Sequence, residues 1–119
     1  PAVEDAKKNA AANGVSNCTF VLGDLKDKLT RDTRWLADHA KSNVMIIDPP
    51  RAGMHDKVVQ EVLEMNAERI VYVSCNPATQ ARDLKLMCNE TGYSIVEVQP
   101  VDMFPHTYHI ENVVSLVRS

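Results

Sequence analysis

Hydrophobic positions in this sequence switch repeatedly between a helical period and short, almost continuous runs. Residues 55–66 place valine, leucine and methionine at helical spacing, whereas residues 44–47 and 69–73 are nearly all apolar. Runs of this length and composition favour strands that are covered on both faces, as in a parallel sheet. The whole pattern predicts helices at 2–13, 30–41, 55–66 and 78–89, and strands at 18–22, 44–47, 69–73, 93–104 and 110–117.

The order of these elements predicts an α/β fold. Strands that alternate with helices indicate crossover connections and a mostly parallel sheet, and the last two strands suggest an antiparallel hairpin. Loops at 23–24, 48–51 and 74–77 each follow a predicted strand. Because ligands of such sheets bind beyond the carboxyl ends of the strands, we expect all three loops to line one rim.

Composition narrows the class of protein. A length of 119 residues suits one domain. The chain carries 13 Lys and Arg against 16 Asp and Glu, and this net charge of −3 supplies no basic surface for nucleic acid. No apolar run approaches the length of a membrane helix. Cys18, Cys75 and Cys88 have no paired spacing, so we expect no disulfide framework and a reducing, cytoplasmic environment. The chain opens on Pro1 and enters a helical pattern at once, from which we expect a segment of a longer polypeptide.

The motif Asp48-Pro49-Pro50-Arg51 ends a predicted strand. Two prolines fix φ and remove two backbone donors, so we expect a stiff loop whose carbonyls are left for a ligand. Asp48 then presents a carboxylate at a fixed place on the rim. The alternative is a plain strand terminator in which Asp48 caps a nearby helix.

The motif Ser74-Cys75-Asn76-Pro77 follows the next strand. Asn76 is a favoured N-cap and Pro77 a favoured first helical residue, so Cys75 should lie just before a helix N-terminus. Backbone N–H groups and the helix dipole favour an anion there, which makes Cys75 a candidate nucleophile. Free cysteines are more often small buried hydrophobes, and this is the interpretation for the other two cysteines.

Residues 104–112 read FPHTYHIEN. His106 and His109 have no third ligand at a suitable spacing, which disfavours a zinc site. Glu111 opens an apolar strand, where a carboxylate is either a solvated strand edge or a general base.

In order and approximate spacing, DPPR, SCNP and FPHTYHIEN resemble the catalytic half of the RNA uracil-5 methyltransferases, which make 5-methyluridine in tRNA and ribosomal RNA. The resemblance implies that residues 1–119 are the C-terminal part of a methyltransferase catalytic domain. Its fold would be a Rossmann-like class I sheet without the first two strands. It also implies S-adenosylmethionine as cofactor and an RNA substrate, tRNA or rRNA, reached through the full-length parent, with no membrane and no metal.

Two residues match catalytic positions of the family. A thiolate at Cys75 would add to carbon 6 of uracil and turn carbon 5 into an enolate carbon that can accept a methyl group. Glu111 would remove the proton from carbon 5 before the thiolate is expelled. The rival hypothesis is a non-catalytic α/β binding module in which both residues are incidental.

Other residues match orienting and cofactor-binding positions of the family. Asp48 matches the DPPR aspartate, which with Pro49 and Arg51 would orient uracil or cofactor. Asp24 resembles the acidic residue that many methyltransferases place near the cofactor's adenine. Relatives that methylate exocyclic amino groups usually carry an aromatic residue after the proline pair, and Arg51 in its place favours uracil.

Parts of the family's pattern lie outside this chain. The resemblance implies that the glycine-rich cofactor loop, the first two strands and the RNA-binding parts precede Pro1. We therefore expect the isolated segment to bind S-adenosylmethionine weakly or not at all and to be inactive on its own. We also expect it to expose a hydrophobic sheet edge. Because such an edge tends to be covered, we expect one of three arrangements. The strands 18–22 and 44–47 pair directly, the N-terminal segment is displaced, or the chain self-associates through the edge.

Overall fold

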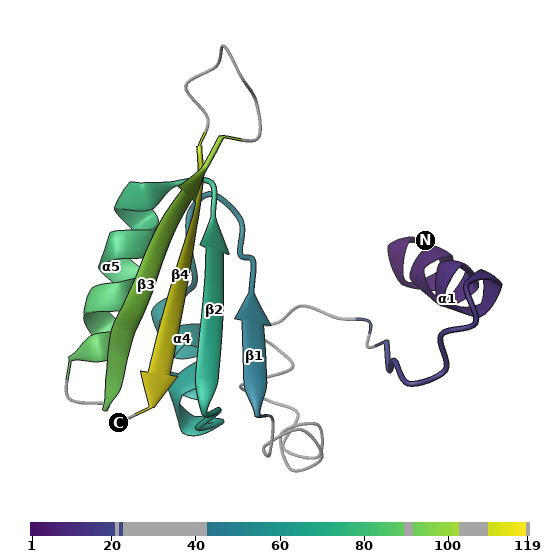
Figure 1. Ribbon diagram of the computed structural model, residues 1–119, viewed down its shortest axis with the longest axis horizontal. Coiled ribbons are helices and arrows are strands. Elements are labelled where there is room, and N and C mark those ends of the chain that lie inside the picture. Colours follow the sequence, from purple (N-terminus) through teal and green to yellow (C-terminus); the bar gives the residue numbers. More distant parts are fainter. Residues whose placement is uncertain (21, 23–42, 90–91, 103–109, 119) are drawn as a thin grey trace.

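The computed structural model describes residues 1–20, 22, 43–89, 92–102 and 110–118 (Figure 1). In these residues four strands form one sheet, and helices α4 and α5 cover one of its faces. Helix α1 lies apart from the sheet, beyond the edge formed by β1. The elements in chain order are α1 (Ala2–Ala12), β1 (Val44–Ile47), α4 (Asp56–Glu64), β2 (Arg69–Ser74), α5 (Pro77–Cys88), β3 (Tyr93–Val101) and β4 (Glu111–Arg118).

Most of the predicted elements are confirmed. The elements found match, to within a few residues, those predicted at 2–13, 44–47, 55–66, 69–73, 78–89, 93–104 and 110–117. The helix predicted at 30–41 lies outside the described residues.

The sheet has the order β1-β2-β4-β3. β1 and β2 run parallel, with Ile47 opposite Tyr72 at the last pair. β4 lies antiparallel to both β2 and β3, which confirms the predicted hairpin. The β3–β4 ladder contains a one-residue shift between Ile95 and Glu97. Among the described strands, one pair is parallel and two pairs are antiparallel, so this part of the sheet is mixed.

The strand predicted at 18–22 is wrong in its described part. Residues 18–20 and 22 are not in a strand, and Leu22 is 74% exposed. A strand needs a neighbour to pair with its backbone groups, and these residues pair with none of the four described strands. The expected direct pairing with 44–47 is therefore not found, and β1 has β2 on one side only within the described sheet.

The expectation that β1 and β2 are covered on both faces is also wrong. In β1, Ile47 is 6% exposed but Val44 and Ile46 are 54% and 72% exposed. In β2, fully buried Ile70 and Tyr72 alternate with residues that are less buried. Since α4 and α5 both lie on one face, the opposite face, which we call the open face, is uncovered by described residues.

The core fills the space between the sheet and the two helices. Val58, Val59 and Val62 of α4 are at most 4% exposed, and they belong to the same buried cluster as Ile70 and Tyr72 of β2. Burial of apolar side chains is the main favourable contribution to folding, so this layer fixes how α4 sits on the sheet.

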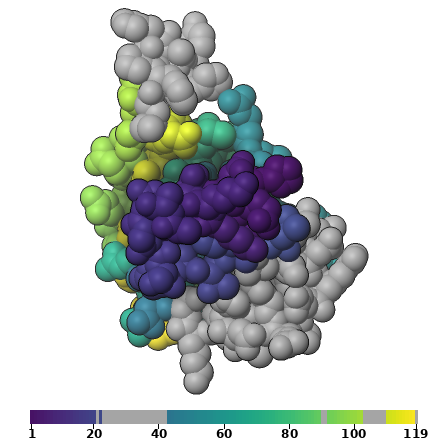
Figure 2. All heavy atoms as spheres, turned by 90° about the vertical axis from the view of Figure 1, so that its right-hand side faces the viewer, coloured from purple at the N-terminus to yellow at the C-terminus, as the bar shows by residue number. Residues whose placement is uncertain are grey.

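Helix α1 ends as predicted at Asn13 and Gly14. Gly14 has a φ of +68°, a left-handed conformation that glycine adopts without strain. Figure 2, which looks from the side of α1, shows this helix in front of the rest of the molecule. None of its residues is buried. No described helix combines the length and hydropathy needed to cross a bilayer.

Candidate active site

Cys75 lies in a turn that is fixed on both sides. Before it, Ser74 is buried, and its Oγ accepts a hydrogen bond from the Asn76 backbone N–H at 3.0 Å. After it, Asn76 caps α5, with Oδ1 accepting from Ala78 N at 3.1 Å and Thr79 N at 3.5 Å. Pro77 is the first helical residue, as the sequence predicts. Cys75 itself is half-buried, so its thiol is not sealed inside the core.

The other two cysteines differ from Cys75. Cys88, at the end of α5, packs against the buried cluster, and burial raises the pKa of its thiol. This agrees with the interpretation as a small hydrophobe. Cys18 is exposed, so that interpretation is wrong for Cys18, because the strand that would have buried it does not form.

Strand pairing brings Glu111 and Cys75 to the same end of the sheet. In the antiparallel β2–β4 ladder, Val73 pairs with Val113 and Ser74 with Asn112, which is the last pair. Cys75 follows Ser74 directly, and Glu111, the half-buried first residue of β4, precedes Asn112. The two candidate residues therefore flank the same strand pair.

Asp48 belongs to the same rim. It follows β1 directly and is exposed, next to the last pair of the parallel ladder, Ile47 and Tyr72. In Figure 1 the arrows of β1 and β2 both point toward the top of the sheet, where β4 begins. The predicted rim is thus confirmed for the loops 48–51 and 74–77, while Asp24 lies outside the described residues.

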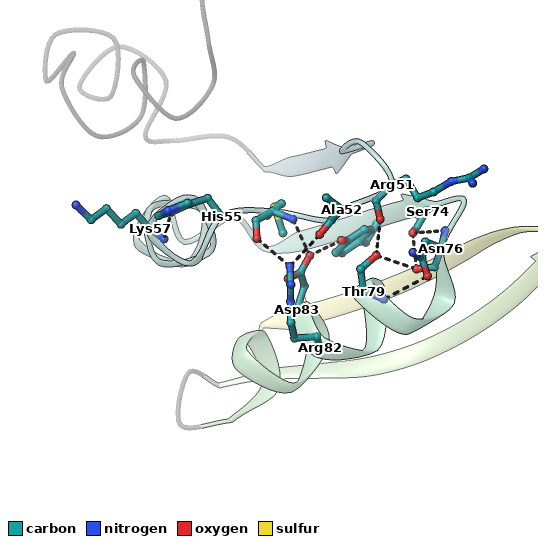
Figure 3. A network of polar contacts seen from close by, with 11 residues as sticks. Arg51, Ala52, His55, Lys57, Ser74, Asn76, Thr79, Arg82 and Asp83 are labelled. Atoms are coloured by element: carbon teal, nitrogen blue, oxygen red, sulfur yellow. Dashed lines mark hydrogen bonds and ion pairs between the residues drawn. The ribbon is translucent and has the colours of Figure 1, made fainter.

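The proline loop is bonded to the protein itself. Gly53 N donates to the Pro50 carbonyl at 2.8 Å, and Thr79 Oγ1 of α5 donates to the Arg51 carbonyl at 2.8 Å. These two carbonyls are therefore not left for a ligand, contrary to the expectation from the sequence. In Figure 3 the Arg51 side chain extends away from these contacts, and Pro49 is half-buried.

A buried carboxylate on α5 holds the end of this loop. Asp83 is 0% exposed, and its Oδ2 accepts from Tyr72 Oη at 2.6 Å and from Met54 N at 2.9 Å. Arg82 pairs with the same carboxylate at 3.3 Å and donates to the carbonyls of Ala52 at 3.0 Å and Met54 at 3.3 Å (Figure 3). Burial, and then the hydrogen bond to Asp83, raise the pKa of Tyr72 far above its ordinary value.

Gly53 makes this packing possible. Its φ is +82°, and a Cβ built there would lie 2.8 Å from Asp83 Oδ2 and 3.0 Å from Arg82 Nη2. A side chain at this position would thus meet the network and strain the backbone at once. The absence of a side chain at Gly53 therefore allows the loop after DPPR to adopt this conformation.

Gln80 was missed by the sequence analysis. It is 1% exposed, and its Nε2 donates to the carbonyls of Tyr72 at 3.0 Å and Asn112 at 3.1 Å, while its Oε1 accepts from Asn112 Nδ2 at 2.7 Å. The available signal was the spacing of Gln80, Asp83 and Met87, which puts two polar residues on the inward face of α5.

No group of three potential metal ligands occurs among the residues that the structure describes. His106 and His109 lie outside them.

The geometry can be set beside known proteins. All residues, 1–119, match the sequence profile of the tRNA (uracil-5-)-methyltransferase family. The chain belongs to this family. An RNA methyltransferase of Porphyromonas gingivalis is 54% identical over 118 residues, which cover 99% of this chain and 25% of that protein. Another, from Bacteroides thetaiotaomicron, is 56% identical over 115 residues, covering 97% of this chain and 24% of that protein. The chain thus spans about a quarter of the length of these relatives.

Solved structures agree with the family. The tRNA (uracil-54, C5)-methyltransferase of Pyrococcus abyssi, in complex with S-adenosyl-L-homocysteine, matches with a TM-score of 0.79 and 37% identity, over 98% of this chain and 26% of that one. The magnesium protoporphyrin IX methyltransferase of Synechocystis matches over 98% of this chain and 54% of that one, with a TM-score of 0.63 and 15% identity. The second likeness shows the fold alone, an α/β methyltransferase sheet, as the sequence predicts.

Proposed function

We propose that this segment is the C-terminal part of a catalytic domain that transfers a methyl group from S-adenosylmethionine to carbon 5 of a uridine in tRNA or rRNA. Family membership supports the methyltransferase activity, and the Pyrococcus relative is named for uracil-54 C5 methylation. The observation that carries the proposal is the Ser74–Asn112 pair of the β2–β4 ladder, because Cys75 and Glu111 are the residues next to this pair.

Cys75 supplies the nucleophile. Carbon 5 of uracil is too weakly nucleophilic to take a methyl group directly. The Cys75 thiolate adds to carbon 6, so a sulfur–carbon bond forms and the electrons of the carbon 5–carbon 6 double bond move into an enolate. The turn before α5, where the helix dipole favours an anion, supports this role.

Glu111 supplies the base. After carbon 5 has formed its bond to the methyl group, it carries both that group and a proton. The Glu111 carboxylate takes the proton, the double bond re-forms, and the Cys75 thiolate leaves from carbon 6. Its place next to the Ser74–Asn112 pair, at the same end of the sheet as Cys75, supports this step, because the proton and the sulfur sit on adjacent carbons of one ring.

Asp48 and Pro49 lie where the cofactor of such a sheet binds, beyond the carboxyl end of a parallel strand. When bound, S-adenosylmethionine supplies the methyl group on a positively charged sulfur, and an exposed carboxylate at the rim complements that charge. We assign Asp48 to orienting uracil or cofactor, with Pro49 and Arg51 shaping the loop.

The experiment uses the full-length protein that carries this segment and RNA containing 5-fluorouridine, where carbon 5 bears no removable proton. We expect a covalent protein–RNA complex that withstands denaturing electrophoresis and is lost in Cys75→Ala. Cys18→Ala, which removes an exposed thiol away from the rim, is the matched control and should retain the complex. If the unaltered protein forms no such complex, the non-catalytic binding module is the better account.

A further inference from the structure

Gln80 joins three elements at the rim. Its side chain comes from α5, and its amide contacts the Tyr72 carbonyl of β2 and both the carbonyl and the side chain of Asn112 in β4. Asn112 is the residue next to Glu111. Two of the three bonds thus act on Asn112, one on its backbone and one on its side chain.

Asn112 and Glu111 lie on opposite faces of β4. Side chains alternate between the two faces of a strand, and the bonds to Gln80 hold Asn112 on the face covered by α5. Glu111 must then point to the open face. A slip of β4 by one residue would exchange the two and turn the carboxylate toward the helices.

Cys75 comes directly after β2, whose last residue, Ser74, is buried on the helix-covered face. Ser74 and Asn112 form the last pair of the β2–β4 ladder. The position of Asn112 therefore sets where Glu111 begins β4 relative to the turn that carries Cys75.

Burial holds the later part of β4 in register. Val114 and Leu116 are 0% exposed, and β4 pairs with β2 without interruption from Asn112 to Val117. The first residues of β4, 111–113, are only half-buried, so burial holds this end of the strand less firmly. The contact between Gln80 and Asn112 lies at this end, next to Glu111.

We propose that the Gln80–Asn112 pair is a positioning device that fixes the start of β4 and so aims Glu111 at the uracil held by Cys75. The proposal rests on the proposed function. It makes Gln80 a positioning residue that acts on the proton-removal step through Asn112. Addition of the Cys75 thiolate, which does not need Glu111, should be nearly independent of it.

The test separates these two steps in the full-length protein. In Gln80→Leu we expect turnover on uridine RNA to fall about 10- to 100-fold, because misplacing a catalytic group usually lowers the rate by about this factor. The covalent intermediate should accumulate on uridine RNA, as it should in Glu111→Gln. The rate of complex formation with 5-fluorouridine RNA should stay within about threefold of the unaltered protein.

Asn112→Ser provides a milder variant, because Asn112 is only half-buried and the substitution removes just the bond to Gln80 Oε1. It should show the same accumulation to a smaller degree. Ser115→Ala is the matched control. It removes another hydrogen bond between β2 and β4, from Arg69 Nη1 at 2.9 Å, but four positions from Glu111, and should accumulate nothing.

Each outcome decides one point. Equal losses of complex formation and turnover in both variants, or no accumulation in either, would overturn the positioning role of Gln80 and leave the proposed function standing. Absence of any complex between the unaltered protein and 5-fluorouridine RNA would overturn the function itself, and the positioning role with it.

Discussion

A buried carboxylate such as that of Asp83 needs hydrogen-bond donors around it. A carboxylate without solvent costs free energy unless donors surround it. Asp83 receives a phenol, a backbone N–H and a guanidinium, and each donor comes from a different position in the chain. The result is that Tyr72 of the sheet, α5 and the end of the proline loop share one anchoring point.

Removing the phenol should weaken that point. Tyr72→Phe takes one donor from a fully buried carboxylate, so we expect the free energy of unfolding to fall by about 1–3 kcal/mol, measured by urea titration at neutral pH. Tyr93→Phe is a matched comparison, because its hydroxyl donates to the neutral Ala67 carbonyl and should cost less. Equal urea midpoints for the Tyr72 variant and the unaltered protein would contradict this account.

The same substitution should change the response to alkali. The folded-state pKa of Tyr72 lies above the value of about 10 found in unfolded chains. Stability from such a group is complete below the unfolded pKa and is lost as the pH rises above it. The unaltered protein should therefore lose stability above pH about 10, and Tyr72→Phe should lose less of it over that range.

At this scale the sequence identifies residues whose chemistry is visible in a motif. Cys75, Asp48 and Glu111 could be proposed because a thiol and two carboxylates interrupt apolar strands and turns. Gln80 and Asp83 were missed, because polar residues in an amphipathic helix usually face water. The spacing of Gln80, Asp83 and Met87 puts them on one face of α5, but which face is inward depends on contacts with distant strands.

Helix α5 is the element on which the rim depends. Its N-terminus follows the turn that carries Cys75, and its first turn is held by the Asn76 side chain. The cap thus serves both the stability of the helix and the position of the thiol before it.

Loss of the cap should be measurable on its own. In Asn76→Ala the two backbone N–H groups that Asn76 satisfies lose their acceptor, and we expect the free energy of unfolding to fall by about 1 kcal/mol in a urea titration. Asn89→Ala, at the other end of the same helix, is the control and should change it little. A cap variant as stable as the control variant would show that the turn is held by other contacts.

Elements with their own hydrophobic period were predictable, and one without a partner was not. Helix α4 and strand β2 could be read from spacing, since each buries a face against the other's layer. Residues 18–22 have strand composition, but a strand exists only where another strand accepts its hydrogen bonds. The hydrophobic pattern shows that a segment tends to form a strand, but it does not show whether a neighbouring strand is present to pair with it.

On the scale of the whole molecule, the sheet is asymmetric. One face is packed against two helices, while Val44 and Ile46 of the edge strand β1 are more than half exposed on the other. Continuous apolar runs predicted two covered faces, and only one is covered by described residues. Exposed apolar edges of this kind favour association with another strand.

We expect this 119-residue chain to self-associate through β1. Ile46→Lys should weaken the association about tenfold or more, because burying one such side chain is worth about 1.5–3 kcal/mol. Sedimentation velocity over a concentration series measures it. Val98→Lys, the same kind of change at a residue of β3 that is 52% exposed, is the control and should leave association unaltered. A chain that stays monomeric at every concentration would refute the prediction.

Helix α5 is hydrogen-bonded both to the loop that follows Asp48 and to the two strands next to which Cys75 and Glu111 lie. Thr79, Arg82 and Asp83 make the first connection, and Gln80 makes the second. If α5 shifts when RNA or cofactor arrives, thiol and carboxylates travel with it as a unit. The distances between Cys75, Asp48 and Glu111 would then stay the same, even where their distances to the bound base change.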